Sequence, residues 1–600
     1  MIALEIDSGT GSRRIDLLSY LDRDREERAH EDEYAWIKSL RHLRVDSVPF
    51  RSRFTLRGDS LWWFAELYLH KQQRILNVFR TLAAFDALIE QERPLAVRYV
   101  DGPLAGAIAR AAAARKVRYN GPGWDGSPAR SLLKLRMRGS GLAIAARLSR
   151  LRRRGVQAHP TRVAVFVHRA FWRPDAADGS AESYIGPVLR ALEARLASGD
   201  VQYIGVGPHT NFRARRWWHP LLGRSAVHAG DPVVPIERYA PASALRASLS
   251  IYRDRHRIRE SLWASADMRA HAVIKGCDCW PLVRDELAGI ALLQFPWSAR
   301  AMDEAAAALD ATRPQVAVTY AEAGGWGRAL ALECRRRGIP LAGLQHGFIY
   351  RHWLNYRHEP DEMSRDPQHA EDAGFPYPAA TLLFDAQAAH HLTTAGRFPA
   401  DAIAVTGSAR LDELLAQVRT LTADAIEAVK RDSGALDGRV LVLFAGKERE
   451  ARRFMPALVE AVRSMPDVQL VIKPHPAETP DVYTNVVRDA PNVHVALSSV
   501  PLPVLLAAAR AVVTVNSTVA IDAISLGVPS LVIGLPNNLS PFVDAGVMLG
   551  AGSPVEIRQA LRRLLYDQEF RSRLERTPER RAAERSADAI LALATSHRKT

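Results

Sequence analysis

Short apolar runs alternate with helical segments through the last third of the chain, and each run leads into a polar loop. Four of these runs span residues 440–444, 468–472, 511–515 and 530–533. Nearly continuous apolar runs predict strands buried on both faces, as in a parallel sheet covered by helices. Ligands of such sheets bind beyond the carboxyl ends of the strands. We therefore expect functional side chains in the loops that follow these four strands.

The same alternation predicts a second parallel sheet earlier in the chain. Strands are expected at residues 163–167, 201–206, 316–320 and 341–344, with helical segments between them. We therefore predict an α/β fold with two Rossmann-like lobes facing a cleft and an elaborated N-terminal lobe. The expected domains are an N-terminal α/β region with a basic helix, an acceptor-side lobe, and a donor-side lobe with C-terminal helices, at residues 1–155, 156–425 and 435–600.

Two positively charged loops follow the first two strands of the donor-side lobe. Lys447 and Arg449 come directly after one strand, and a Lys-Pro-His-Pro sequence at residues 473–476 comes after the next. The two prolines fix the backbone and remove two amide donors, so Lys473 and His475 project from a stiff platform. The loop therefore presents one ammonium group and one imidazole at the end of its strand.

A third strand of the donor-side lobe ends at the start of a helix. Asn516, Ser517 and Thr518 lie between this strand and a helix that begins near Val519, with Ser517 or Thr518 as the N-cap. Hydroxyls and free amides at a helix N-terminus bind anions, most often phosphate. Asp522 lies one turn further on the same side as Thr518. A carboxylate there would repel phosphate but could accept hydrogen bonds from ribose hydroxyls.

The Lys-Pro-His-Pro loop and the Ser-Thr-x3-Asp-x4-Gly-x-Pro pattern at residues 517–529 together resemble the donor domain of GT-B-fold transferases. The resemblance is to bacterial capsule and teichoic-acid enzymes, including CDP-glycerol glycerophosphotransferases and bacterial sialyltransferases. The hydrolysing UDP-N-acetylglucosamine 2-epimerases share this fold and a similar helix start. The resemblance implies that His475, Ser517 and Thr518 hold nucleotide phosphates and that Asp522, where many such enzymes have Glu, holds the ribose.

Two titratable residues follow strands of the acceptor-side lobe. Glu322 follows the strand at residues 316–320, and His346 follows the strand at 341–344 within a Gln-His-Gly sequence that also resembles those transferases. A base near the acceptor must remove a hydroxyl proton. His346 is our first choice because imidazole titrates near neutral pH. Glu322 would need desolvation to raise its pKa, or could orient His346; a purely structural role for the histidine is the alternative.

The composition bounds the class of protein. The chain has 600 residues, of which 47% are apolar and 24% charged, as in ordinary globular domains. Its net charge of +15 favours anionic partners. No helix-turn-helix, zinc or RNA-recognition pattern is visible, so we do not expect nucleic-acid binding. Three cysteines form neither a disulfide framework nor a four-ligand zinc pattern. We expect a cytoplasmic protein without a metal site, whose only nucleotide is its donor substrate.

A basic segment at residues 132–154 contains eight lysines and arginines and no acidic residue, with leucine and alanine between them. Basic amphipathic helices bind anionic membrane surfaces, which would place the protein at the inner face of the plasma membrane. A solvated helix that joins two lobes is the equally weighted alternative.

These observations lead to one function and two alternatives. The first is transfer of a sugar or polyol phosphate from a nucleotide-activated donor to a cell-surface glycan or lipid-linked acceptor. The second is a UDP-N-acetylglucosamine 2-epimerase-like reaction, which needs acid and base groups around the sugar ring. The third is a non-catalytic nucleotide-binding protein of envelope assembly, because one fold hosts many functions.

Overall fold

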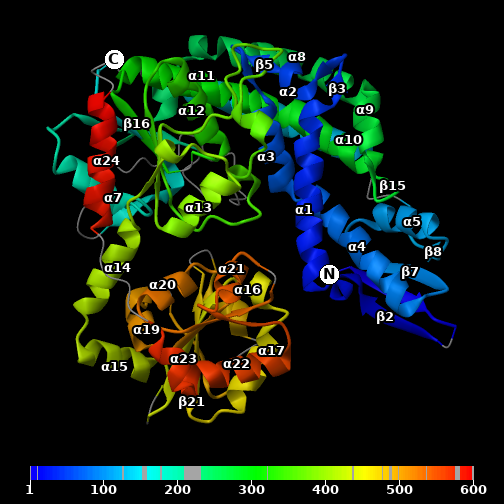
Figure 1. The fold of residues 1–600 in the computed structure, drawn as a ribbon, viewed down its shortest axis with the longest axis vertical. Helices are drawn as coiled ribbons and strands as arrows, with labels where there is room; N and C mark the ends of the chain where they lie inside the picture. Colours follow the sequence, from blue (N-terminus) through cyan, green and yellow to red (C-terminus); the bar gives the residue numbers. More distant parts are fainter. Residues whose placement is uncertain are drawn as a thin grey trace. The chain divides into compact units, whose positions relative to one another are not determined.

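The computed structural model divides into two compact units. Unit 1 comprises Met1–Thr406 and Glu584–Thr600, and unit 2 comprises Gly407–Ala583 (Figure 1). The structure describes residues 2–9, 11–123, 128–151, 159–175, 179–207, 232–320, 322–435, 438–475, 478–484, 490–497, 499–535, 537–574 and 581–596.

Unit 2 is built on a six-stranded sheet in which every neighbouring pair of strands is parallel. The strand order is β22-β21-β20-β23-β24-β25. Numbered along the chain this is 3-2-1-4-5-6, the order of a Rossmann fold. The strands are β20 (Val440–Gly446), β21 (Val468–Pro474), β22 (Val493–Val495), β23 (Ala511–Thr514), β24 (Ser530–Ile533) and β25 (Leu549–Ala551).

Both faces of this sheet are buried, which explains why its strands read as nearly continuous apolar runs. Val442 and Phe444 of β20 pack in a core with α17 (Met455–Arg463) and α22 (Pro554–Tyr566). Leu441 and Leu443 of the same strand belong to a second core. That core includes side chains from α14 (Ala409–Arg419), α15 (Ala423–Asp432) and α19 (Leu502–Ala508).

Unit 1 contains a seven-stranded parallel sheet of the same type. Its order, β13-β12-β9-β16-β17-β18-β19, again places the first strand of the sheet beside the fourth. The strands are β9 (Val163–His168), β12 (Val201–Val206), β13 (Val233–Pro235), β16 (Val316–Thr319), β17 (Leu341–Leu344), β18 (Ala380–Leu383) and β19 (Ile403–Val405). The predicted α/β class with two Rossmann-like lobes is confirmed; the cleft between the lobes stays a prediction.

The predicted elaboration of unit 1 is largely helical. A four-stranded sheet, β2-β1-β7-β8, lies beside a group of packed helices. These elements are β1 (Ala3–Asp7), β2 (Ser12–Asp16), β7 (Ala96–Asp101), β8 (Arg118–Asn120), α1 (Arg23–Ser39), α3 (Trp62–Gln72), α4 (Arg74–Glu92), α5 (Ala105–Ala114), α6 (Pro128–Leu151), α8 (Arg246–Ala264) and α10 (Trp280–Gly289). The helices α11 (Phe295–Thr312) and α12 (Gly325–Arg336) pack both against this group and on the parallel sheet.

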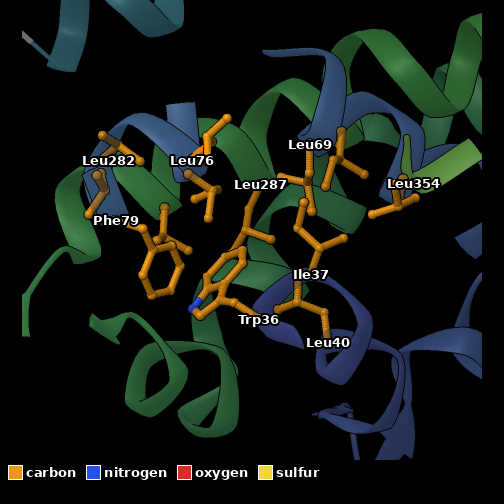
Figure 2. Close-up of a cluster of buried hydrophobic side chains, with 14 of the residues drawn as sticks. Trp36, Ile37, Leu40, Leu69, Leu76, Phe79, Leu282, Leu287 and Leu354 are labelled. Atoms are coloured by element: carbon orange, nitrogen blue, oxygen red, sulfur yellow. The ribbon is translucent and has the colours of Figure 1, made fainter. Parts of the chain in front are cut away.

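A single apolar core joins helices that are far apart in the sequence. Trp36 of α1 packs among Leu76 and Phe79 of α4 and Leu282 and Leu287 of α10 (Figure 2). The indole nitrogen of Trp36 donates a hydrogen bond to a main-chain carbonyl at 2.9 Å, so its one polar group is satisfied inside the core. The same core includes Ala329 of α12 and Leu383 of β18, so the N-terminal region and the parallel sheet form one compact unit.

The division between the units differs from the expected domain boundaries. Residues 423–432, which lie across the expected end of the acceptor-side lobe at residue 425, form α15 and pack into unit 2 through Ile426 and Val429. The last helix, α24 (Ala582–Ser596), returns to unit 1, where Ser586 Oγ lies 3.0 Å from Thr406 Oγ1. Unit 2 is therefore an insertion between β19 and α24.

A buried cluster of charges ties the helices of unit 1 together. Lys38 of α1 donates to Glu66 of α3 at 2.6 Å and to Glu362 at 2.7 Å. Arg328 of α12 also pairs with Glu66, and all four side chains are at most 2% exposed. Removing one partner of such a cluster leaves a charge buried without compensation, which is more costly than losing an exposed pair.

We predict that Lys38→Met lowers the free energy of unfolding of unit 1 by about 3–5 kcal/mol, because the Glu362 carboxylate loses its cation. The matched control is Lys430→Met, which removes a half-exposed pair with Glu427 and should cost less than about 1 kcal/mol. Denaturant titration followed by circular dichroism measures both. Equal midpoints for the two variants would contradict the assigned role of Lys38.

Candidate functional site

In unit 2 the chain reverses the direction in which it adds strands between β20 and β23. Such a switch point opens a crevice at the carboxyl ends of the two strands. Thr514 at the end of β23 joins them, because its hydroxyl donates to the carbonyl oxygen of Ala445 at 2.6 Å. The amide of Ser517 in turn donates to Thr514 Oγ1 at 3.0 Å. Thr514 therefore sets the position of the Ser517 loop at the switch point.

Ser517 and Thr518 lie at the predicted position, at the start of α20 (Val519–Ser525). Ser517 Oγ accepts from the amide of Val519 at 3.3 Å, and the side chain of Thr518 makes no capping bond. Because α20 has only seven residues, its dipole is short, and the hydroxyls rather than the helix are the main feature at this point. Phosphate binding by these residues stays a prediction.

Lys473 lies near the end of β21, the strand next to β20, and His475 directly follows that strand, while Pro476 lies outside the described residues. The ammonium group of Lys473 donates to the carbonyl oxygens of Leu497 at 3.0 Å and Val500 at 2.7 Å. These bonds fix the loop after β22 to the end of β21. Partial burial lowers the pKa of Lys473.

Partial burial also lowers the pKa of His475, and the charge of Lys447 adds to this effect. The imidazole is therefore mostly neutral near pH 7 in the absence of an anion. Lys447 follows β20 at the switch point and is about one-third exposed, and Arg449 is about half exposed. An anion bound between these cations would favour protonation of His475, which is the behaviour expected of a phosphate-binding histidine.

Asp522 lies where the sequence placed it, on α20, but it is buried. Its Oδ1 accepts a hydrogen bond from the guanidinium of Arg410 on α14 at 2.6 Å, and burial raises its pKa. Its Oδ2 has no hydrogen-bond partner among the described residues. The ion pair attaches α14 to α20, and a ribose contact through Asp522 stays a prediction.

The sequence interpretation missed three residues that shape this loop cluster, Thr514, Arg410 and Asn537. The amide nitrogen of Asn537 donates to the carbonyl oxygen of Val515 at 2.7 Å, and so joins the loops after β23 and β24. Polar residues at the end of an apolar strand, as for Thr514, or in the loop that follows one, as for Asn537, are the signal that could have indicated these two residues. No sequence signal pairs Arg410 with Asp522.

Unit 1 has its own switch point, between β9 and β16. The two strands are joined at their carboxyl ends, because the amide of His168 donates to the hydroxyl of Tyr320 at 2.8 Å. Burial lowers the pKa of His168 to about 4, so this imidazole is neutral at physiological pH. The rings of Tyr320 and Tyr184 form an aromatic wall at this edge of the sheet.

His346 follows β17 and packs against that wall. Its ring lies edge-on to Tyr320 at 5.4 Å and to Tyr184 at 5.6 Å between ring centroids. Burial lowers the pKa of His346, and a hydrogen bond to the Tyr320 main chain acts in the opposite direction. A neutral, partly exposed imidazole in a fixed orientation can accept a proton.

Glu322 follows β16 and is only 2% exposed. The hydroxyl of Tyr356 donates to Glu322 Oε1 at 2.8 Å, whereas Oε2 has no hydrogen-bond partner in the described part of the chain. Burial raises the pKa of Glu322 to about 7. Gly343 makes room for this side chain, since a Cβ there would lie 2.8 Å from the Glu322 Cγ atom. Glu322 therefore has the desolvated environment that a role as base would need to raise its pKa.

Two further observations concern metals and membranes. Within the described ranges, no three His, Cys, Asp or Glu side chains are grouped so that they could hold a metal ion. None of the described helices combines the length and the apolar character needed to cross a membrane.

Comparison with known families supports the resemblance in unit 2. Residues 442–538 match a family described as "Capsule polysaccharide biosynthesis protein". This stretch runs from β20 to the loop after β24, and it contains all of the predicted donor-binding residues. No curated protein matches the sequence significantly.

Solved structures show a weaker likeness. A UDP-GlcNAc 2-epimerase from Neisseria meningitidis bound to UDP-GlcNAc aligns with 14% identity over 73% of this chain and 100% of its own, with a TM-score of 0.44. A putative UDP-N-acetylglucosamine 2-epimerase from Listeria monocytogenes aligns with 18% identity over 73% of this chain and 97% of its own, with a TM-score of 0.43. The spinosyn rhamnosyltransferase SpnG aligns with 17% identity over 73% of this chain and 99% of its own, with a TM-score of 0.38. At these scores the alignments carry no conclusion about this chain.

The raised pKa of Glu322 predicts a pH-dependent stability. Between pH 4.5, where an ordinary glutamate titrates, and about 7, the folded protein holds this proton while the unfolded chain releases it. The contribution of Glu322 to the free energy of unfolding should therefore fall as pH rises through this window, by on the order of 3 kcal/mol.

Glu322→Gln should remove this component, because the amide oxygen can still accept from Tyr356 but cannot ionise. Denaturant titrations of wild type and variant at pH 5 and pH 8 would measure the difference. Glu427→Gln, at an exposed carboxylate of unit 2, is the control and should keep the wild-type pH dependence. Identical pH dependence in wild type and Glu322→Gln would show that Glu322 titrates normally.

Proposed function

We propose that the protein is a glycosyltransferase or glycerophosphotransferase. It would transfer a sugar or polyol phosphate from a nucleotide-activated donor to a cell-surface glycan or lipid-linked acceptor. One observation carries this proposal: Lys447, His475 and Ser517 follow three neighbouring strands around the switch point of the sheet that matches the capsule polysaccharide biosynthesis family. Cations, an imidazole and hydroxyls at that point suit the phosphates of a nucleotide.

In this proposal unit 2 stabilises the leaving nucleotide. Lys447, Arg449 and His475 supply positive charge where the pyrophosphate or phosphate develops charge as its bond to the transferred group breaks. Ser517 and Thr518 donate hydrogen bonds from their hydroxyls. Lys473 acts indirectly, because its ammonium group already holds the loop after β22 in place. These donors take the part that a divalent cation has in many nucleotide-dependent enzymes, so no metal is part of the proposal.

Unit 1 would supply the base for the acceptor hydroxyl. His346 is the better placed of the two predicted residues, because it is partly exposed and neutral, whereas the carboxylate of Glu322 is enclosed. Glu322 would keep the β16 and β17 loops in position through Tyr356. The setting of the reaction would be the cytoplasmic side of the envelope, where nucleotide donors are available.

Incubation of the full chain with a panel of nucleotide-activated sugars and polyols, with and without EDTA, tests this proposal. Released nucleotide together with a modified glycan or lipid-linked acceptor supports transfer, and retention of activity in EDTA supports the role of the cations. An isomerised sugar without transfer would favour an epimerase-like enzyme, and binding without turnover a non-catalytic protein. Either result would overturn the proposal.

His475→Ala should weaken donor use by about tenfold to hundredfold, because a charge-assisted hydrogen bond to phosphate contributes about 1.5–3 kcal/mol. The control is His494→Ala, at a histidine within β22 rather than at a strand end, which should leave donor use unchanged. Nucleotide affinity from calorimetry and turnover from nucleotide release measure the effect. A folded His475→Ala protein with wild-type affinity and turnover would remove this residue from the site.

His346→Ala should lower turnover by about 10²–10⁴-fold while the nucleotide affinity of unit 2 survives, as expected for loss of a general base. Glu322→Gln should have a smaller effect, because an amide can still accept from Tyr356. His390→Ala, at an exposed position in α13 (Ala386–Thr394), is the control. Abolished turnover in Glu322→Gln with a mild effect of His346→Ala would exchange the two roles.

A further inference from the structure

Helix α6, which contains most of the basic segment, packs on unit 1 through one of its faces. A Cβ at Gly139 would lie 2.7 Å from the carbonyl oxygen of Leu292, so glycine permits the close approach of the helix at this point. Near the end of α6, Arg150 is buried, donates to the carbonyl oxygen of Ala240 at 2.8 Å and pairs with Glu304. This inner face also lines an apolar cavity of about 280 Å³ against α8 and α11.

The outer face of α6 is apolar as well, and it is exposed. Leu133, Met137, Ile144 and Leu148 are 58%, 67%, 56% and 42% exposed. At about 100° per residue, their spacing of i, i+4, i+11 and i+15 places all four within an arc of about 60°. We call these four residues the apolar stripe. A solvated linker helix would carry polar side chains on this face, so the stripe points to a binding surface.

Exposed cations flank the stripe on both sides. Lys134 and Arg138 follow it on one side of the helix, and Arg136 and Arg147 lie on the other. The whole of α6 contains no acidic residue. A partner for this face must therefore accept apolar side chains at its centre and carry negative charge on both sides.

We propose that α6 lies in the surface of an anionic lipid bilayer. The apolar stripe would enter the boundary between headgroups and acyl chains, and the four flanking cations would contact lipid phosphates. A second copy of this chain suits the face less well, because two such helices would bring eight cations together and the chain as a whole carries a net charge of +15. The inference goes beyond the proposed transfer reaction and does not depend on it.

Sedimentation of the full chain with phosphatidylcholine vesicles, with and without phosphatidylglycerol, tests the inference. Binding should require the anionic lipid and weaken as salt is added, because salt screens surface charges. Arg136→Gln with Arg147→Gln should lower the partition coefficient about fivefold for each charge removed. Met137→Ser with Ile144→Ser should lower it at least tenfold at the same salt concentration.

The matched control is Val555→Ser, which removes an equally exposed apolar side chain from α22 in unit 2 and should leave vesicle binding unchanged. All substituted positions are exposed, and circular dichroism with thermal melting checks that each variant folds. The inference is overturned by equal binding to neutral vesicles, by no binding at low salt, or by an equal loss in Val555→Ser. It is also overturned if Met137→Ser with Ile144→Ser converts a dimer to a monomer in light scattering while vesicle binding is unchanged.

Discussion

Burial of both faces of two parallel sheets is the constraint on which the rest of this structure depends. The hydrogen bonds between parallel strands are satisfied within the sheet, and helices remove both faces from water. The side chains of a strand can then reach solvent only where the strand ends. At the carboxyl ends of β20, β21 and β23 the chain places Lys447, His475 and Ser517, and at those of β16 and β17 it places Glu322 and His346.

The same burial determines the chemistry of the groups that lie just inside these edges. The Glu322 carboxyl is enclosed by Gly343 and Tyr356, so desolvation moves its pKa upward to about 7. Desolvation moves the pKa of His346 downward, so both groups are closer to neutral than the free side chains would be. The third group, Asp522, is buried as an ion pair with the guanidinium of Arg410 on α14. Burial thus produces a carboxyl group with a pKa near 7, an uncharged imidazole and a buried ion pair.

The strands could be predicted from the sequence, whereas several side-chain partners could not. A nearly continuous apolar run such as residues 440–444 has few alternatives to a buried strand, and β20 extends it only to Gly446. The contacts of Lys473 and Asp522 depend on loops or helices distant in sequence, with Arg410 lying 112 residues from its partner. The charges of the basic segment were visible, but which of its leucines face outward depends on the packing of Gly139 against Leu292.

The insertion of unit 2 between β19 and α24 determines the order in which the two units can complete their folding. Unit 2 is one continuous stretch of chain, so it can fold as soon as it has been synthesised, whereas unit 1 still lacks α24. Until then Thr406 and the Val405 carbonyl at the end of β19 lack the hydroxyl of Ser586 and the guanidinium of Arg585. The segment that follows unit 2 therefore completes a unit that was begun before unit 2, and loss of that segment alone would leave β19 uncovered beside an intact unit 2.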